Sequence, residues 1–252
     1  MILTVVGSGS LVPSPRRSTP ALALESGGLQ VTVDGGSGTL RRQAELGIDF
    51  RKTNTLFFTH IHPDHTLDLL HFLFASKHTP GFQRDRPIRI VGPPGFEKFL
   101  DHFRDGVKSW TDGGESGMEV LEMGDGEKLD LGTLMVEAVE LDHSVMDVGY
   151  RFHDETGGTA AFTGDTGWCK ALEDLARNVD VFVTECSGDA DHPAPGHLTA
   201  PEVGKVAAAA SVKQVILTHL YPLPDDRIRL TQVARHYDGP VLLSTDGARF
   251  MV

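Results

Sequence analysis

Runs of apolar and alternating residues predict that strands and helices follow one another in two rounds. Apolar runs at helical spacing, or a capping signal, predict helices over residues 40–46, 67–73, 97–103 and 169–176 and from Thr199. Thr199 and Glu202 have the spacing of a capping box. Short β-favouring runs predict strands at residues 2–6, 29–33, 54–58, 87–91, 119–123, 134–141, 160–163, 179–184, 215–218 and 241–244.

This order predicts an α/β protein without linkers or low-complexity segments. We therefore expect a single domain over residues 1–252, in which two similar halves, about 1–118 and 119–252, share one core. Polar side chains that can bind metals stand at the ends of several predicted strands: His143, Asp165 and His219. Since α/β sheets build their sites at the carboxyl ends of neighbouring strands, these residues are expected to converge.

The densest group of such residues follows the strand predicted at 54–58. His60 and His62 are two positions apart, so an extended backbone can point both the same way. Asp64 and His65 come at the start of the next helix. Imidazole nitrogens with carboxylate oxygens suit zinc, iron or manganese, whereas magnesium and calcium prefer oxygens alone. The cluster predicts a transition-metal site and leaves the choice of metal open.

The composition of the chain limits the kinds of partner that we expect it to bind. The chain has 35 acidic and 23 basic residues, a formal charge of −12, which disfavours non-specific binding to nucleic acid or anionic membranes. Cys169 and Cys186 form no metal-type pair and are expected to be reduced thiols. The first residues run into a strand pattern without a signal sequence, and no apolar stretch reaches the roughly 18–20 residues that span a bilayer. We expect a soluble, cytoplasmic protein with no membrane partner.

Two further patterns allow alternatives. The glycine-rich residues 34–39, between a strand and a helix, could offer backbone N–H groups to an anion or form only a tight turn. Six basic residues could form a phosphate-binding rim or only a solvated charged face: Arg16, Arg17, Arg41, Arg42, Arg51 and Lys52.

The order of these motifs resembles the metallo-β-lactamase superfamily and is most similar to its ribonuclease Z branch and the related phosphodiesterases. The resemblance covers nearly the whole chain and implies an αββα four-layer sandwich with a site along one edge. The motifs that carry it are Gly7-Ser-Gly-Ser10, Asp34-Gly-Gly-Ser-Gly-Thr39, Thr59-His-Ile-His-Pro-Asp-His65, His143-Ser144, Phe162-Thr-Gly-Asp165-Thr166, Thr184-Glu185, His197-Leu-Thr199 and Leu217-Thr-His219.

The resemblance also implies two divalent metal ions, zinc first, with manganese or iron as alternatives. It implies that Asp165 bridges the ions and that a hydroxide held between them attacks the substrate. Asp64 would orient that hydroxide. The further ligands implied are His60, His62 and His143 for one ion, and Asp64, His65 and His219 for the other.

His197 and Glu185 match a pair that the ribonuclease Z branch uses near the leaving group. A histidine held by a carboxylate can protonate a departing oxygen. The resemblance thus implies three catalytic residues, Asp64, His197 and Glu185.

We therefore expect a dinuclear metal-dependent hydrolase, a phosphodiesterase of ribonuclease Z-like type. One departure bears on the substrate. Many ribonucleases Z carry a basic, glycine-rich arm that grips tRNA between the third metal histidine and the bridging aspartate. Here the interval from His143 to Asp165 is short and has one arginine, Arg151. A small phosphodiester or other small ester is thus expected rather than tRNA.

Alternatives to this function are a metal-dependent hydrolase of a lactone, thioester or sulfate ester, and a non-catalytic, metal-stabilised binding module. A homodimer is implied by the resemblance alone.

Overall fold

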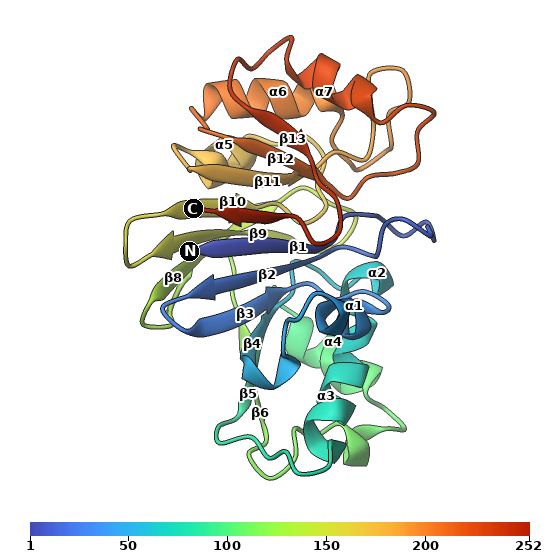
Figure 1. The fold of residues 1–252 in the computed structure, drawn as a ribbon, viewed down its shortest axis with the longest axis vertical. Helices are drawn as coiled ribbons and strands as arrows, with labels where there is room; N and C mark the ends of the chain where they lie inside the picture. The colour runs from blue at the N-terminus through green and yellow to red at the C-terminus, as the bar shows by residue number, and fades with distance from the viewer.

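The computed structural model describes residues 1–252 and contains two seven-stranded sheets packed face to face, with helices on both outer sides (Figure 1). The first sheet has the order β14-β1-β2-β3-β4-β5-β6, and its strands β3 to β6 are parallel. These strands are β1 (Ile2–Gly7), β2 (Ala21–Ser26), β3 (Leu29–Val33), β4 (Thr53–Phe57), β5 (Ile88–Gly92), β6 (Met118–Glu122) and β14 (Arg249–Met251).

The second sheet has the order β13-β12-β11-β10-β9-β8-β7, with β10 to β13 parallel. Its strands are β7 (Lys128–Asp130), β8 (Leu134–Leu141), β9 (Asp147–Asp154), β10 (Thr159–Phe162), β11 (Val181–Glu185), β12 (Val215–Thr218) and β13 (Val241–Leu243). The helices of the chain are α1 (Thr39–Glu45), α2 (Pro63–Thr66), α3 (Asp68–His78), α4 (Phe96–Phe103), α5 (Ala171–Ala176), α6 (Ala200–Ala209) and α7 (Arg227–Val233), with short 3-10 turns at Phe50–Lys52 and Lys108–Trp110.

Successive side chains of the parallel strands point alternately to the core between the two sheets and to the helices outside, which gives the four layers. In β11, Val181 and Val183 belong to the core between the sheets, whereas Phe182 packs beneath α5, α6 and α7. In β4, Phe57 faces the other sheet and Leu56 faces the helices of the first half. Parallel strands buried on both faces read as nearly continuous apolar runs, which is why the sequence identified them. The predicted αββα sandwich is confirmed.

All ten predicted strands are present, and so is the capping box of Thr199 and Glu202 at the start of α6. Four strands and one helix were not predicted: β2, β7, β9, β14 and α7. β2 contains two alanines, which have low β propensity, and the apolar residues of β9 alternate with an arginine and a histidine.

The first and last strands of the chain pair with each other in the first sheet. β14 pairs antiparallel with β1, and β6 also belongs to the first sheet. The predicted division into halves near residue 118 stays a prediction. None of the helices has both the length and the apolar character needed to cross a membrane.

The parallel strands end on the same side of the sandwich, toward the right of Figure 1, where α2 lies. The loops after β4, β10, β11 and β12 leave the sheets at this edge. These loops carry the site.

Candidate metal centre

The seven predicted ligands come together at this edge, although they are up to 159 residues apart in sequence, from His60 to His219. They lie in two groups that share Asp165. His60 follows β4, His62 precedes α2, Asp64 and His65 belong to α2, and His143, Asp165 and His219 follow β8, β10 and β12.

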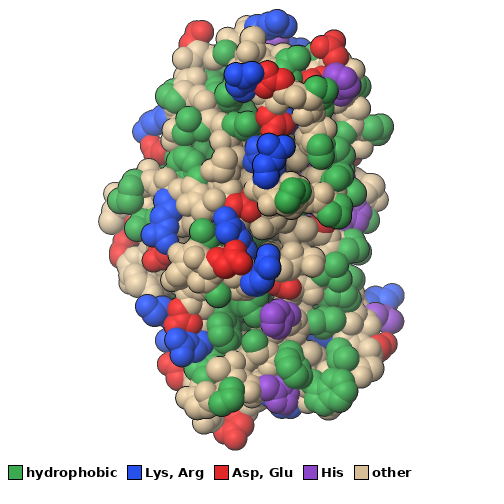
Figure 2. All heavy atoms as spheres, turned by 45° about the vertical axis from the view of Figure 1, so that its right-hand side comes forward, with side chains coloured by type: hydrophobic (Ala, Val, Ile, Leu, Met, Phe, Trp, Pro, Cys, Tyr) green, Lys and Arg blue, Asp and Glu red, His purple; other side chains and the backbone are tan.

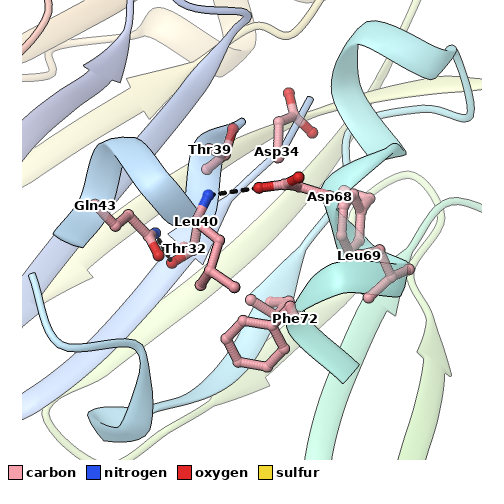
Figure 3. Close-up of a pocket in the computed structure, with 11 residues that line it drawn as sticks. Thr32, Asp34, Thr39, Leu40, Gln43, Asp68, Leu69 and Phe72 are labelled. Atoms are coloured by element: carbon pink, nitrogen blue, oxygen red, sulfur yellow. Dashed lines mark hydrogen bonds between the residues drawn. The ribbon is translucent and has the colours of Figure 1, made fainter. Parts of the chain in front are cut away.

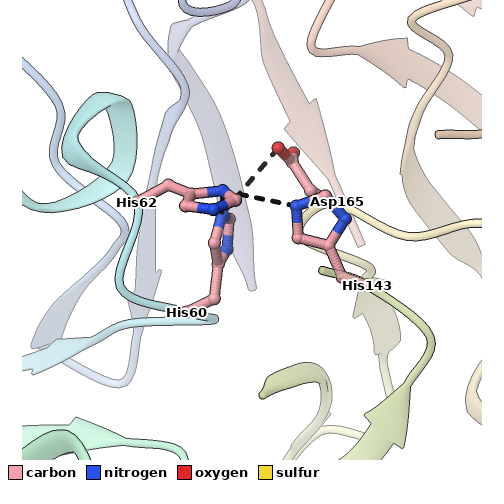
Figure 4. Close-up of side chains that lie close together, drawn as sticks. All are labelled: His60, His62, His143 and Asp165. Atoms are coloured by element: carbon pink, nitrogen blue, oxygen red, sulfur yellow. Dashed lines mark hydrogen bonds and ion pairs between the residues drawn. The ribbon is translucent and has the colours of Figure 1, made fainter. Parts of the chain in front are cut away.

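The first group consists of His60, His62, His143 and Asp165, whose ligand atoms all lie within 4.8 Å of one another (Figure 4). Nδ1 of His62 lies 3.0 Å from Nε2 of His60 and 3.3 Å from Nε2 of His143. Oδ2 of Asp165 lies 3.8 Å from Nε2 of His60. Three imidazole nitrogens and a carboxylate oxygen are a donor set that suits zinc and related metals.

The second group consists of Asp64, His65, Asp165 and His219, again within 4.8 Å. Oδ1 of Asp165 lies 3.3 Å from Nε2 of His65 and 3.2 Å from Nε2 of His219. Burial favours the neutral acid, but the charges of His219 and His65 outweigh it and hold the pKa of Asp165 well below its usual range. Asp165 therefore presents one carboxylate oxygen to each group, as a bridging ligand would.

Four buried atoms of the second group have no hydrogen-bond partner: Oδ2 of Asp64, Nε2 of His65, Oδ1 of Asp165 and Nε2 of His219. Buried polar atoms in folded proteins are nearly always paired, and leaving one unpaired costs about 1–3 kcal/mol. Two negative and two imidazole donors that converge without partners fit a divalent cation. The residues present thus fit the metal centre that the motifs predicted.

Three of the histidines are held from behind by side chains that the sequence did not assign to the site. Nδ1 of His65 lies 2.8 Å from Oδ2 of Asp34, and Nδ1 of His60 lies 3.0 Å from the Thr59 hydroxyl, with Oδ2 of Asp147 at 2.9 Å. Nδ1 of His219 lies 2.8 Å from the Ser187 hydroxyl. Such partners select the tautomer that leaves Nε2 free for a metal.

Asp34 and Asp147 reach this position for different reasons. Asp34 has a positive φ of 57° and accepts hydrogen bonds from the backbone N–H and the hydroxyl of Thr59, so one carboxylate orients two segments. Asp147 opens the unpredicted strand β9. Burial and the nearby charges of Asp165 and Asp34 raise the pKa of Asp147 well above its usual range. Asp34 stood in a recognisable motif, whereas nothing in the sequence distinguished Asp147.

The glycine-rich residues 34–39 form a structural turn. The carboxylate of Asp68 accepts hydrogen bonds from the N–H groups of Gly38, at 3.2 Å, and Leu40, at 2.5 Å. The anion at this turn is thus a side chain of the protein itself. A Cβ on Gly36 would lie 1.8 Å from the carbonyl oxygen of Asp64, so the turn needs glycine to pack against α2. The adjoining cavity (Figure 3) has about 20 Å³, enough for one water molecule and too small for an organic ligand.

His197 and Glu185 also meet, as predicted. Nδ1 of His197 lies 2.9 Å from Oε1 of Glu185, which is fully buried and accepts a hydrogen bond from the Thr166 N–H. Burial lowers the pKa of His197, but the hydrogen bond and charge of Glu185 outweigh it and raise that pKa above its usual value. The ring stacks on His219 with centroids 5.3 Å apart. The pair thus stands directly beside the second ligand group.

Tyr221 was missed by sequence reasoning. Its hydroxyl lies 3.4 Å from Nε2 of His197, the nitrogen that faces away from Glu185. Burial, with the nearby charges of Asp165 and Glu185, raises the pKa of Tyr221 to about 12. The only sequence signal was its place two residues after His219.

A cleft of about 630 Å³ opens beside the first group and is bordered by His62, Asp64, Arg41, Thr19 and Leu67 among others. Figure 2, in which the right-hand side of Figure 1 comes forward, shows basic side chains with acidic ones among them across the middle of this face. A cleft of this size accommodates a small organic substrate.

The six basic residues do not form one rim. Arg17 donates to the Ser8 hydroxyl and the Ser244 carbonyl and pairs with Asp226, so it is part of the fold. Arg42 and Arg51 pair with Glu45 and Asp49, and Lys52 borders a different cavity. Arg16 and Arg41 are exposed at the clefts beside the site.

Comparison with known proteins places these residues in a family context. A family model described as the beta-lactamase superfamily domain matches residues 30–220, a range that includes all seven predicted ligands and the His197–Glu185 pair. Uncharacterized protein ML1173 of Mycobacterium leprae is 33% identical over 254 residues, covering 96% of this chain and 81% of that protein. A ribonuclease Z of Mycobacterium marinum is 28% identical over 246 residues, covering 87% of this chain and 86% of that protein. The metallo-beta-lactamase fold protein YhfI from Bacillus subtilis has a TM-score of 0.86 at 20% identity, with 99% of each chain covered.

Proposed function

The chain belongs to the metallo-β-lactamase superfamily, near its ribonuclease Z and phosphodiesterase branch, and on this premise we propose that it is a dinuclear metal-dependent phosphodiesterase. The observation that carries the proposal is the position of Asp165, whose two oxygens face two separate groups of ligand atoms. A single-ion site would not need a carboxylate shared in this way.

Seven residues would hold the ions: His60, His62 and His143 for the first, Asp64, His65 and His219 for the second, and Asp165 for both. Zinc is the first choice for this donor set, and manganese or iron are alternatives. When bound, two such ions would act as Lewis acids and lower the pKa of a coordinated water molecule.

The protein's own groups would position the reacting atoms and move a proton. The carboxylate of Asp64, at the wall of the cleft, would orient the attacking oxygen. As the bond from phosphorus to the leaving oxygen breaks, protonated His197 would donate its Nε2 proton to that oxygen and release an alcohol. Glu185, bonded to Nδ1, would hold the ring and stabilise its charged form.

The surroundings of the site favour a small phosphodiester over tRNA. The interval between His143 and Asp165 consists of β9, a turn and β10, both strands paired within the second sheet, so no basic arm extends from it. Arg41 borders the large cleft and is exposed; its ion pair with Glu45, at 3.6 Å, is loose and would leave the guanidinium able to attract an anionic group. One or two accessible arginines suit a single phosphate better than a polynucleotide, whose binding requires many cations.

The test is hydrolysis of bis(p-nitrophenyl) phosphate by protein loaded with zinc, manganese or iron, with bound metal counted in the same samples. We expect metal-dependent turnover that falls by roughly a hundredfold or more in Asp64→Asn. Asp112→Asn, at an exposed loop, is the matched control and should keep full turnover. A protein that holds two ions and does not turn over this diester would refute the phosphodiesterase proposal and favour lactones, thioesters or sulfate esters.

A further inference from the structure

We propose that the cleft between residues 9–17 and 220–226 binds the leaving alcohol of the substrate, and that Tyr221, between this cleft and His197, is a catalytic residue that donates a hydrogen bond to the leaving oxygen. The inference rests on the proposed function, because it assigns a subsite to the same reaction. This cleft has about 220 Å³ and is separate from the larger one beside His62. Both clefts include Ser14 and Arg17 in their walls, so they flank the same loop.

The contacts of His197 locate the leaving oxygen. Its Nδ1 is bonded to Glu185, which leaves Nε2 as the nitrogen that can give a proton to a substrate. The Tyr221 hydroxyl lies 3.4 Å from that nitrogen, and the same side chain lines the smaller cleft. An oxygen placed to receive the His197 proton would therefore meet the Tyr221 hydroxyl as a second hydrogen-bond donor.

A buried arginine fixes Tyr221 in this place. Arg229 has no exposed surface and donates to the carbonyl oxygen of Tyr221 at 2.7 Å and to that of Ser187 at 2.8 Å. It also pairs with Asp226 at 2.7 Å, and Asp226 lies 3.2 Å from Arg17 on the opposite wall of the cleft. These links connect both walls to the loop that holds His219, so the cleft is formed before any ligand arrives.

The walls of the cleft indicate the chemical class of the alcohol. Val12 and Leu223 supply apolar surface, while Ser14 and Thr245 supply hydroxyl groups. Asp226 is shared between Arg17 and Arg229, and Arg16 forms no ion pair, so a positive charge remains at the cleft beside its hydroxyl groups. The cleft has about 220 Å³ against about 630 Å³ for the one beside His62, which suits a single sugar ring rather than a larger group. We assign the cleft to a hydroxyl-bearing alcohol of pentose size.

The first test compares two symmetrical diesters, bis(p-nitrophenyl) phosphate and bis(ribos-5-yl) phosphate, in the metal-loaded protein. Nitrophenolate leaves without a proton, whereas a ribose hydroxyl needs one. Tyr221→Phe should therefore lower kcat for the ribosyl diester at least about tenfold more than for the nitrophenyl diester. Tyr237→Phe removes a hydroxyl that donates to the Val212 carbonyl, away from the site, and should change neither rate. Equal losses with both diesters in Tyr221→Phe would overturn the role of Tyr221.

The second test detects the cleft without turnover. Saturation-transfer NMR with methyl β-ribofuranoside at millimolar concentration should show binding to the wild-type protein. Leu223→Trp, which fills the cleft, should abolish that signal and raise KM for the ribosyl diester about tenfold, whereas Leu242→Trp on the exposed face of β13 should not.

The two proposals fail separately. Absence of ribofuranoside binding in a protein that hydrolyses bis(p-nitrophenyl) phosphate would overturn the cleft assignment alone. Binding that Leu223→Trp abolishes, in a protein inactive on both diesters, would uphold the ribofuranoside site itself and would refute the phosphodiesterase proposal together with the leaving-alcohol role.

Discussion

Two opposite edges of the sandwich both bury acidic side chains, but they satisfy them differently. At the edge beside the chain ends, Asp154 accepts hydrogen bonds from the Ser26 hydroxyl at 2.6 Å and the Thr156 N–H at 2.8 Å, and lies 3.5 Å from the Met1 ammonium. At the other edge, Asp64 and Asp165 each have a buried oxygen without a partner.

The difference separates a buried carboxylate that the fold itself satisfies from one that is available to a cation. A buried charge is tolerated when the fold pairs it, and Asp154 is paired. The edge with the predicted ligands instead collects unpaired atoms, and three of its histidines, His60, His65 and His219, are supported from behind by Asp147, Asp34 and Ser187. Such an arrangement costs folding free energy and is compensated when a cation binds.

The largest effect is expected from Asp165→Asn, because both ligand groups lose the carboxylate that joins them. Bound metal should fall from two ions per chain to one or fewer, and hydrolysis of bis(p-nitrophenyl) phosphate by roughly a thousandfold. Metal analysis and initial rates measure both. Asp154→Asn at the opposite edge is the control and should keep two ions. Two ions retained in Asp165→Asn would refute the shared carboxylate.

A smaller effect is expected from Asp34→Asn. The variant keeps the size of the side chain but removes the charge that orients His65, so the affinity of the second ion should fall roughly 10–100-fold. Chelator competition measures this affinity. The first group, in which His65 takes no part, should lose much less, and an equal weakening of both ions would show that Asp34 acts on the fold as a whole.

Asp154→Asn should reduce the free energy of unfolding by about 1–2 kcal/mol at neutral pH through the weakened hydrogen bonds. Hydrogen bonds from Ser26 and Thr156 hold the pKa of Asp154 below its usual value. A depressed carboxyl pKa stabilises the fold above the unfolded pKa of about 3.9 and loses that contribution as the pH falls toward the folded value.

The difference between Asp154→Asn and wild type should therefore shrink below about pH 4. Denaturant unfolding across pH measures it, with exposed Glu155→Gln as the control. A difference that stays constant down to the lowest accessible pH would contradict the assignment to this carboxylate.

The smallest effect is expected from Asp68→Ala. This variant tests whether a carboxylate near the predicted ligands matters for metal binding when it already has hydrogen-bond partners. Asp68 lies near the ligand edge, yet its carboxylate is satisfied by the start of α1. We expect a loss of about 1 kcal/mol in unfolding free energy, as for a removed helix cap, and unchanged metal content. Loss of an ion in this variant would mean that nearness to the site, rather than the lack of partners, defines the metal centre.

Much of this site could be predicted from sequence because its chemistry is concentrated in short segments. His60, His62, Asp64 and His65 lie within six consecutive positions, and His143, Asp165 and His219 each follow a strand that the sequence predicted. The parallel strands were found for the same reason, since their two buried faces produce continuous apolar runs.

The supporting residues could not be found in this way. Asp147 is the first residue of β9, a strand that was not predicted because polar residues interrupt its apolar pattern. The role of Asp147 depends on the packing of β9 beside Thr59. Ser187 and Tyr221 act through contacts with residues 32 and 24 positions away. Arg229 is a fully buried cation in a helix that the apolar pattern did not indicate. Their roles arise from tertiary contacts, and no local pattern encodes those contacts.

The most direct test of the central claim is the number of metal ions bound per chain after loading with zinc and removal of excess metal. We expect two ions in the wild-type protein, because two groups of potential ligand atoms share Asp165. One ion per chain, or none, would contradict the dinuclear site.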